Sequence, residues 1–346
     1  MPELPKAFNH DNSMGLVRYY LAFAVFVAHF NAVYDAGIWF PTDSYNAVGG
    51  FFALSGFLVY PSYLKHRNLK DYMLRRVRRI FPPYMFIVLL CAFALVFVST
   101  LPASEYFFNA QWLKYLASNL TFMNFLCPEL PGVFQDLPVK AVNGSLWTMK
   151  VEILLYLSVP VAVALLTYIH RRARWFGPLL FCIMVYVVSA VWKWYFTELY
   201  YTTEKTIYNI LSRQLFGQLL YFYGGVFVYF VYDRFDNCRH WVMVACVLII
   251  LVSDYVPYTL YRTCISPAVA VGLVMYFSTF RLAGIFNKNN ISYDIYLYHF
   301  PVILVLTTLF GGKGLPVWLV FVIAVACTVV LGMLSWFGIG RKFINR

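Results

Sequence analysis

The chain is poor in charged residues, and especially in acidic ones. Of its 346 residues only 12% are Asp, Glu, Lys or Arg, whereas 62% are hydrophobic, and the mean hydropathy is +0.68. A soluble domain of this length does not need so much apolar surface. The composition therefore excludes a soluble globular protein and indicates an integral membrane protein.

Three further features are missing. The N-terminal stretch MPELPKAFNHDNSMG is polar and has no basic run before a short apolar core, so we expect no cleaved signal peptide and a retained first span. No segment has the composition of a soluble domain or a long linker, which predicts a single transmembrane domain over residues 1–346. Because there is no fixed-period repeat and no pair of matching halves broken by Gly or Pro, a transporter built from repeats is disfavoured.

Cysteine pairs are also lacking. The seven cysteines include no CxxC pair, and most of them fall inside apolar runs. This is typical of small core hydrophobes. We therefore expect neither a metal site nor a disulfide framework.

What the sequence does contain is a series of long apolar runs. A bilayer core needs about 20 apolar residues per helix. We predict an all-α, polytopic integral membrane protein with about ten transmembrane helices, of which the seventh has the shortest apolar run. The longest stretch between spans, 101–145, contains the helix-like QWLKYLASNLTFMNFL and is expected to be ordered. The predicted spans are 14–34, 47–64, 80–100, 146–168, 176–195, 211–232, 241–257, 263–280, 291–310 and 315–338.

The net charge of +12 follows from membrane topology rather than from a nucleic-acid partner. With the N-terminus in the cytoplasm and an even number of spans, both termini are cytoplasmic and most of the 27 lysines and arginines lie on that side. Cytoplasmic loops carry such an excess of basic residues. Seven basic residues fall in outer loops instead: Lys114, Lys140, Lys193, Lys205, Arg213, Arg262 and Lys313.

The first predicted span holds two polar residues in a setting where polar groups are costly. Arg18 and His29 are 11 positions apart in RYYLAFAVFVAHF, which places them on one face of an α-helix, about 16 Å apart along its axis. Arg18 alone could be a snorkelling anchor, and His29 alone a helix-packing hydrogen bond. Together they predict a polar track, with Arg18 near the cytoplasmic end and His29 near the outer end.

Glu152 is the predicted partner of His29. It lies near the outer end of the fourth span, at a depth similar to that of His29. A buried glutamate needs a partner, and a carboxylate that orients a neutral imidazole is the usual arrangement for taking a proton from a hydroxyl. A structural pair of Glu152 with Lys150 is the alternative.

A basic segment joins the second and third spans. It carries seven lysines and arginines within residues 65–79. From spacing alone, a topogenic anchor that contacts acidic lipids is favoured. Arg76 and Arg79 are three positions apart and share a helix face, which also suits two-point binding of a phosphate.

Two other spans contain unusual residues. The second contains GGFFALSGFLVYP, whose glycines 49, 50 and 56 let helix backbones approach closely. The ninth opens with SYDIYLYHFPV and carries His299, which has both a structural and a functional interpretation.

These pieces, in this order, resemble the membrane-bound acyltransferase-3 family over nearly the whole chain. The Arg-x10-His spacing of Arg18 and His29 is the strongest element. Each of the others is a weak signal by itself, but five in order are not expected by chance. The supporting motifs are GFFALSGFL at 50–58, RVRRIFPPY at 76–84, SLWTMKVE at 145–152 and SYDIYLYHFPV at 292–302.

The resemblance implies a membrane-bound O-acetyltransferase of the bacterial inner membrane. Members move an acyl group, usually acetyl, from cytoplasmic acetyl-coenzyme A to a hydroxyl of a surface polysaccharide or lipid-linked sugar. His29 would then be the catalytic base or acyl relay, with Glu152 as the family glutamate. Arg18, Arg76 and Arg79 would bind the coenzyme A.

The resemblance also implies candidates for substrate binding, namely Trp147, Lys150 and His299. Met149-Lys150 and Ile153-Leu154 depart from the family pattern around the Trp-x4-Glu motif, so Lys150 is expected to mark a subfamily. The soluble esterase-like domain that some members carry after the last span is expected to be absent.

The working hypothesis is that coenzyme A docks at the cytoplasmic side, its pantetheine arm passes Arg18, and the thioester reaches His29. Direct transfer and an acyl-histidine relay both fit. The main alternative is a transporter or flippase of a glycolipid or small anion that uses the same residues; a binding scaffold without turnover is a third. The expected partners are acetyl-coenzyme A, the acceptor and membrane lipid, with no permanently bound cofactor and no nucleic acid.

Overall fold

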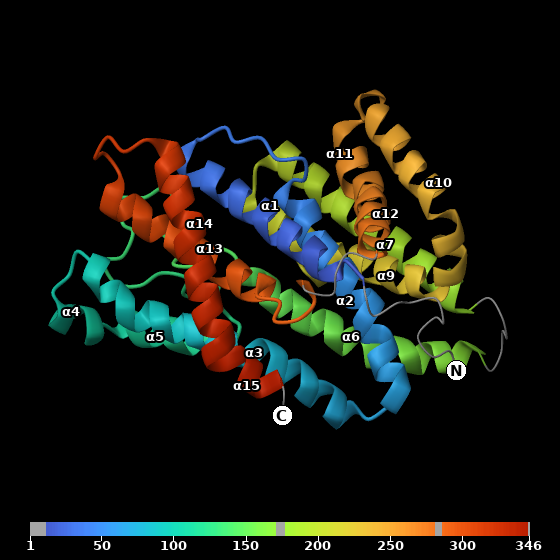
Figure 1. The fold of residues 1–346 in the computed structure, drawn as a ribbon, viewed down its shortest axis with the longest axis horizontal. Coiled ribbons are helices and arrows are strands. Elements are labelled where there is room, and N and C mark those ends of the chain that lie inside the picture. The colour runs from blue at the N-terminus through green and yellow to red at the C-terminus, as the bar shows by residue number, and fades with distance from the viewer. Residues whose placement is uncertain (1–11, 171–176, 281–285, 345–346) are drawn as a thin grey trace. The chain divides into compact units, whose positions relative to one another are not determined.

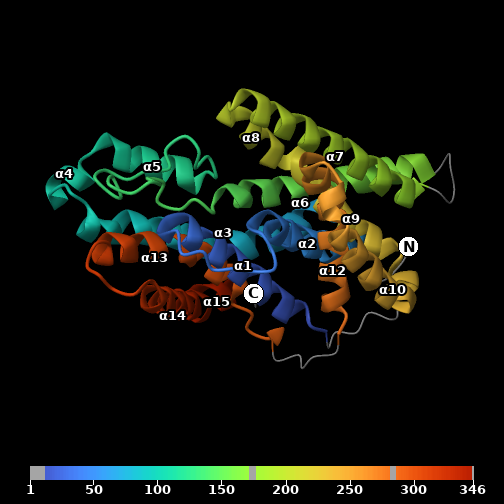
Figure 2. The ribbon, with the colours of Figure 1, turned by 90° about the horizontal axis from the view of Figure 1, so that it is seen from above.

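The computed structural model describes residues 12–170, 177–280 and 286–344, and every regular element in these ranges is a helix, as predicted (Figures 1 and 2). The chain divides into two compact units that alternate along the sequence. Unit 1 comprises Met1–Leu21, Ser44–Tyr72 and Val151–Lys288, and unit 2 comprises Ala22–Asp43, Met73–Lys150 and Asn289–Arg346. The single transmembrane domain expected over the whole chain remains a prediction.

The number of spans is slightly lower than the predicted ten. Eight helices in the described residues are long and apolar enough to cross a membrane, or nine if one bent pair counts as a single span. This pair, Thr206–Phe230 and Tyr232–Leu251, is bent by 112° and corresponds to the predicted spans 211–232 and 241–257. The residues that follow the bend, YDRFDNCRH, are mostly polar, which leaves only the second half of the later helix as a continuous apolar run.

Unit 1 is a bundle in which α9 packs against both α2 and α7. It also receives the start of α1 (Met14–Tyr34) and most of α6 (Trp147–His170). Its other helices are α2 (Ser44–His66), α7 (Gly177–Thr203), α8 (Thr206–Arg213), α9 (Leu215–Phe230), α10 (Tyr232–Leu251), η2 (Ser253–Tyr255), α11 (Tyr258–Leu260), η3 (Tyr261–Ile265) and α12 (Ser266–Ser278).

Glycines set the close packing of α2 against α9. A Cβ on Gly56 of α2 would lie 1.9 Å from the carbonyl oxygen of Phe222, and a Cβ on Gly225 of α9 would lie 2.0 Å from that of Ala53. Each helix thus places a glycine against the other's backbone, the arrangement that lets membrane helices approach closely. The predicted role of Gly56 is confirmed.

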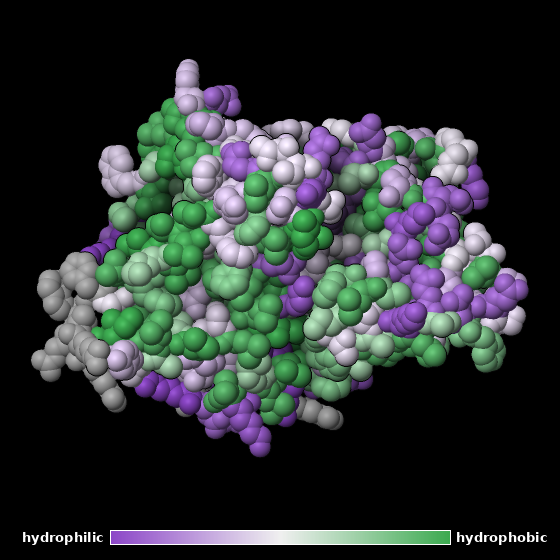
Figure 3. All heavy atoms as spheres, turned by 180° about the vertical axis from the view of Figure 1, so that it is seen from behind, coloured by the Kyte–Doolittle hydropathy of each residue, from purple (hydrophilic) through white to green (hydrophobic). Residues whose placement is uncertain are grey.

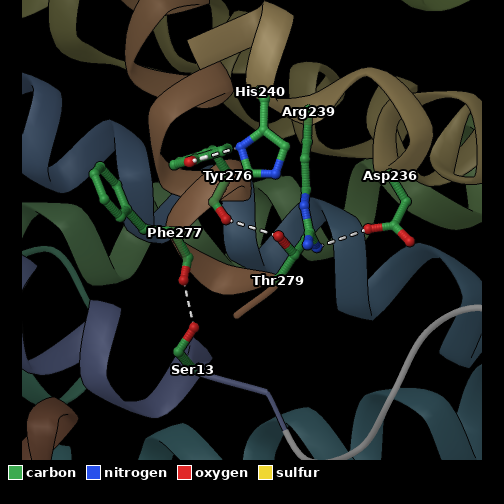
Figure 4. A network of polar contacts seen from close by, with 7 residues as sticks. All are labelled: Ser13, Asp236, Arg239, His240, Tyr276, Phe277 and Thr279. Carbon is green, nitrogen blue, oxygen red and sulfur yellow. Dashed lines mark hydrogen bonds and ion pairs between the residues drawn. The ribbon is translucent and has the colours of Figure 1, made fainter. Parts of the chain in front are cut away.

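The start of α1 is attached to the rest of unit 1 by polar contacts (Figure 4). Ser13 donates a hydrogen bond to the carbonyl of Phe277 near the end of α12, and Asn12 caps α1 by accepting from the Met14 N–H at 3.0 Å. The same figure shows His240 of α10 beside Tyr276, with the ring nitrogen 3.1 Å from the phenol oxygen. The contacts of Asn12 and Ser13 position the helix turn that carries Arg18.

Unit 2 has an aromatic and aliphatic core between α1, α13 and α14. Its buried residues are Phe26, Phe30, Ile303, Leu306, Val320 and Ala324. It includes α1 from Ala22 and α3 (Leu69–Ala94) from Met73. Its other helices are η1 (Leu95–Val98), α4 (Ala103–Phe107), α5 (Ala110–Leu120), α13 (Ser292–Phe310), α14 (Val317–Ser335), η5 (Trp336–Gly340) and α15 (Arg341–Ile344).

The long segment 101–145 is ordered, as predicted. The Asn109 side chain caps α5 by accepting from the Gln111 N–H at 2.9 Å. Tyr106 and Trp112 both donate to the carbonyl of Ala92, at 3.0 and 2.9 Å. Tyr106, which is buried, and Trp112, which is half-buried, therefore attach this segment to the end of α3 through their satisfied polar tips.

Apolar side chains cover much of the face that Figure 3 shows. In α7 the exposed residues Leu180, Met184, Val187 and Val191 recur at helical spacing. A helix that exposes an apolar stripe of this length is suited to lipid rather than to water.

Candidate active site

Two histidines meet in unit 2. Nδ1 of His29 on α1 lies 2.7 Å from Nε2 of His299 on α13. The two rings are nearly parallel, with planes 13° apart and centroids 5.0 Å apart, which fits a hydrogen bond between their edges. Phe300 packs edge-on against His29 at a centroid distance of 4.9 Å. His299 is completely buried, whereas His29 is partly exposed. Of the two rings, His29 is therefore the one that can contact a substrate.

The hydrogen bonds of this pair determine where the protons lie. Nδ1 of His299 is 2.7 Å from the carbonyl oxygen of Tyr296, which can only accept, so Nδ1 carries the proton. Nε2 of a neutral His299 is then an acceptor, and Nδ1 of His29 must donate to it. A neutral His29 consequently has an unprotonated Nε2, which is the form that a general base or a nucleophile needs.

The backbone next to His299 is shaped by Pro301. A proline has no N–H to donate to the carbonyl four residues earlier, which here belongs to Leu297. The side chain of Asn143 replaces that donor, with its Nδ2 2.8 Å from the Leu297 oxygen. Membrane helices tolerate proline when a neighbour satisfies the freed carbonyl in this way. Asn143 thereby supports the turn of α13 that carries His299.

The residues around the start of α6 complete this support. The Ser145 hydroxyl donates to Oδ1 of Asn143 at 2.6 Å, and the Thr148 hydroxyl lies 2.9 Å from that of Tyr296. All four side chains are buried. The hydroxyls therefore join the start of α6 to the α13 turn whose Tyr296 carbonyl orients His299.

Two of the predicted substrate-binding residues lie on the first turn of α6, in the same unit as the histidine pair. Trp147 is half-buried. Lys150 is also half-buried, and its Nζ lies 4.6 Å from the centre of the Phe125 ring. A cation–π contact of this kind leaves the ammonium free to bind an anion or an oxygen-rich ligand.

The predicted phosphate-binding pair also belongs to unit 2. Arg76 and Arg79 lie on α3, where Arg76 is half-buried and Arg79 is exposed. Their spacing of three places them on one face of this helix, as expected.

The remaining two predicted residues belong to unit 1. Arg18 is half-buried on α1, and Glu152 on α6 accepts a hydrogen bond from the Tyr156 hydroxyl one turn later. The pairing of Glu152 with His29 remains a prediction, because His29 belongs to unit 2. The hydrogen-bond partner that the described residues give His29 is His299.

Sequence reasoning missed the histidine pair and its support by Asn143 and Tyr296. One signal was available. Pro301, two positions after His299 inside an apolar span, requires a substitute donor for a buried carbonyl. Asn143, just before another span, is a side chain that can supply one.

Comparison with known proteins gives a consistent result. A family model described as an acyltransferase domain matches residues 11–337. The chain is 25% identical to Nodulation protein 10 of Rhizobium leguminosarum bv. viciae, over 97% of this chain and 94% of that protein. It is also 25% identical to the O-acetyl transferase of Shigella phage Sf6, over 86% of this chain and 84% of that protein. No solved structure matches. Because the family model covers almost the whole chain, the protein belongs to the acyltransferase-3 family and is a membrane acyltransferase.

Proposed function

We propose that the protein transfers an acetyl group from acetyl-coenzyme A to a hydroxyl of a surface polysaccharide or a lipid-linked sugar. The observation that carries this proposal is the hydrogen-bond chain from the Tyr296 carbonyl through His299 to His29, which leaves Nε2 of His29 unprotonated. The similarity to a phage protein named O-acetyl transferase supports acetyl as the group and a hydroxyl as the acceptor.

In direct transfer, His29 acts as general base. Its Nε2 takes the proton of the acceptor hydroxyl while the oxygen attacks the carbonyl carbon of the thioester. The C–O bond forms and the C–S bond breaks. The proton then passes from Nε2 to the departing sulfur, so the products are an ester and the free thiol of coenzyme A.

An acyl-histidine relay uses the same nitrogen as nucleophile. Nε2 would attack the thioester carbonyl, so that the N–C bond forms, the C–S bond breaks and coenzyme A leaves as its thiolate. In the second step the acceptor hydroxyl attacks the acyl carbon, the N–C bond breaks, and the hydroxyl proton passes to the thiolate. His299 serves both routes because the proton it holds on Nδ1 of His29 keeps Nε2 free. His299 is buried and uses both of its ring nitrogens, so in this proposal it positions His29 rather than contacting substrate.

The basic residues belong to the donor in this proposal. Arg76 and Arg79 share a face of α3 and can bind phosphates of coenzyme A from the cytoplasm, while Arg18 lines the route of its pantetheine arm. The distribution of basic residues supports cytoplasmic termini in a bacterial inner membrane. Glu152 orients His29 or the acceptor, and Trp147 and Lys150 contact the acceptor sugar.

The test of this function follows acetyl label from acetyl-coenzyme A into the glycan fraction of cells or proteoliposomes. We expect His29→Ala to reduce the incorporation about a hundredfold or more, since positioned proton transfer contributes that much. His240→Ala is the matched control, because His240 is a histidine of unit 1 that lies outside the pair. We expect it to retain activity.

Two results would contradict the proposal. Unchanged incorporation by His29→Ala, at equal protein level, would remove His29 from the chemistry. Absence of label from every fraction of the wild type, together with accumulation of an unmodified substrate across the membrane, would favour transport instead.

A further inference from the structure

Unit 1 contains a second group of basic residues that the proposed chemistry does not use. Arg213 ends α8, Arg262 lies in η3, and Lys193 is buried in α7 with 6% of its surface exposed. The topology predicted from the sequence places all three on the outer side of the membrane, where basic residues are less frequent than on the cytoplasmic side. Three of the seven outer basic residues thus gather in one part of the fold.

The two arginines share one aromatic ring. The guanidinium carbons of Arg213 and Arg262 lie 4.8 and 4.5 Å from the centre of the Tyr45 ring, and Arg213 also donates to the Tyr45 hydroxyl. Both arginines are half-buried. Two like charges held this close repel each other, and partial burial weakens the screening by solvent. Stacking on a tyrosine does not remove that charge.

No carboxylate neutralises either arginine among the described residues of the chain. The ion pair recorded there joins Arg239 to Asp236, and the nearby Glu198 accepts a hydrogen bond from Thr259 instead. The Nε–H of Arg213 is buried without a hydrogen-bond partner. An unpaired donor on a cation is costly, so this group of residues is suited to receive an anion.

The remaining neighbouring polar groups are uncharged apart from Lys193, and Arg262 itself donates to the Tyr258 hydroxyl. Lys193 places its Nζ 4.7 Å from the centre of the Tyr221 ring. The amide of Asn46 accepts from Tyr221 at 2.9 Å and donates to Ser266 at 2.7 Å, which leaves the Ser266 hydrogen available to a ligand. Guanidinium, ammonium and hydroxyl donors together suit the oxygens of a carboxylate or a phosphate.

The position of the cluster separates it from the coenzyme A phosphates. Tyr45 and Asn46 are at the first turn of α2, whereas the basic segment of residues 65–79 begins at the last turn of that helix. Twenty-odd residues of helix span about 30 Å, the thickness of a bilayer core. If the donor phosphates dock on the cytoplasmic side, this cluster is on the side that the acceptor reaches.

From these observations we propose that Arg213, Arg262 and Lys193 form an acceptor subsite that binds an oxyanion, either a carboxylate or a phosphate, carried by the acceptor sugar. This inference rests on the proposed acyl transfer for the identity of the ligand as acceptor. It adds a specificity, because the favoured acceptor is an acidic glycan or a sugar phosphate rather than a neutral one.

Binding is the appropriate test, since it does not depend on turnover. The full-length protein would be placed in nanodiscs of phosphatidylcholine and titrated with trigalacturonate and with its neutral methyl ester, then with glucose 1-phosphate and with glucose. We expect one of the charged probes to bind at least about tenfold more tightly than its neutral counterpart. The probe that does so distinguishes a carboxylate from a phosphate.

The variants are Arg213→Gln and Arg262→Gln, with Lys205→Gln as control. Lys205 is an exposed outer lysine at the start of α8 and lies outside the cluster. We expect each arginine variant to weaken binding of the charged probe about tenfold or more, with the control nearly unchanged and binding of the neutral probe unaffected. If Arg213→Gln does not fold, Arg262→Gln and the charge-conserving Arg262→Lys still give the comparison.

Three results would overturn the proposal. The first is equal affinity of the wild type for charged and neutral probes. The second is full affinity for the charged probe in both arginine variants. The third is loss of the charged probe's binding when phosphatidylglycerol replaces phosphatidylcholine, because that result would assign the cluster to a lipid headgroup. His29→Ala should retain the binding. If it does while the wild type transfers no acetyl, anion binding stands and the acyl-transfer proposal fails. If the wild type transfers acetyl but shows no preference for charged probes, only the subsite fails.

Discussion

At the residue scale, the protonation state of His29 depends on a neighbour that is 270 positions away in the chain. A histidine in an apolar span has two equivalent tautomers until a hydrogen bond selects one. Here the selection starts at the Tyr296 carbonyl and passes through His299. In the proposed mechanism the partly exposed ring of His29 is the base, and the buried ring of His299 fixes its tautomer.

His299→Ala should therefore lower kcat by roughly ten- to a hundredfold while the KM for acetyl-coenzyme A stays nearly unchanged, because His29 loses its fixed tautomer but not its place. His299→Gln should restore part of kcat, since an amide oxygen can accept from Nδ1 of His29. Steady-state kinetics on the purified variants separates kcat from KM. Equal losses in the Ala and Gln variants would show that the accepting atom has no role.

Two asparagines match the acceptor motif for N-glycosylation, and their burial decides how that match is interpreted. Asn119 and Asn143 both begin Asn-x-Ser/Thr patterns in the segment 101–145 or at its end. Their exposed fractions are only 2% and 8%, and both donate hydrogen bonds to backbone carbonyls. Their role in the fold is to satisfy carbonyls, and neither side chain is accessible to a modifying enzyme.

At the scale of elements, the packing of α2 on α9 depends on what is missing from Gly56 and Gly225. Each occupies a site where a methyl group would overlap a carbonyl oxygen of the opposite helix. In lipid the hydrophobic effect does not hold helices together, and the van der Waals contact that close approach supplies stabilises their packing instead. The two helices can separate only by losing that contact.

We expect Gly56→Ala and Gly225→Ala each to destabilise the protein by about 1–3 kcal/mol, since the carbonyl cannot move without its helix. The measurement is the apparent melting temperature in detergent, and both variants should lower it. Gly338→Ala is the control, because nothing lies within 4 Å of the Cβ it would add. A control that melts as early as the two variants would refute the packing argument.

At the scale of the whole molecule, topology is decided at the bend between α9 and α10. α9 and α10 can form one broken span or cross the membrane twice. The choice decides on which side of the membrane each later loop lies. Crossing by α10 would place η2, including Asp254, on the outer side together with Lys205. The charge distribution of the loops favours this arrangement.

Labelling with a membrane-impermeant maleimide tests this topology. In a background with the exposed Cys238 changed to serine, we expect Lys205→Cys, Asp254→Cys and Lys313→Cys to react in intact cells. Lys70→Cys should react only after permeabilisation. Protection of Asp254→Cys in intact cells would mean that α10 does not cross, and reaction of Lys70→Cys in intact cells would reverse the predicted orientation.

The sequence by itself determined the class of the protein, the position of its helices and its family. Apolar runs long enough for a bilayer leave helices as the only way to satisfy the backbone, so residues 14–34 or 176–195 could be assigned without a structure. Arg18, His29, Arg76 and Arg79 could be proposed as site residues from the sequence, because spacing along one helix is a local property.

Only the tertiary structure decided which distant residues meet. The contacts of His29 with His299, of Asn143 with the Leu297 carbonyl, and of Arg213 and Arg262 with Tyr45 each join helices far apart in the chain. Helix periodicity says which face a residue occupies, but it does not say which helix that face contacts. That choice is made by the packing of whole helices, through close approaches such as the one at Gly56.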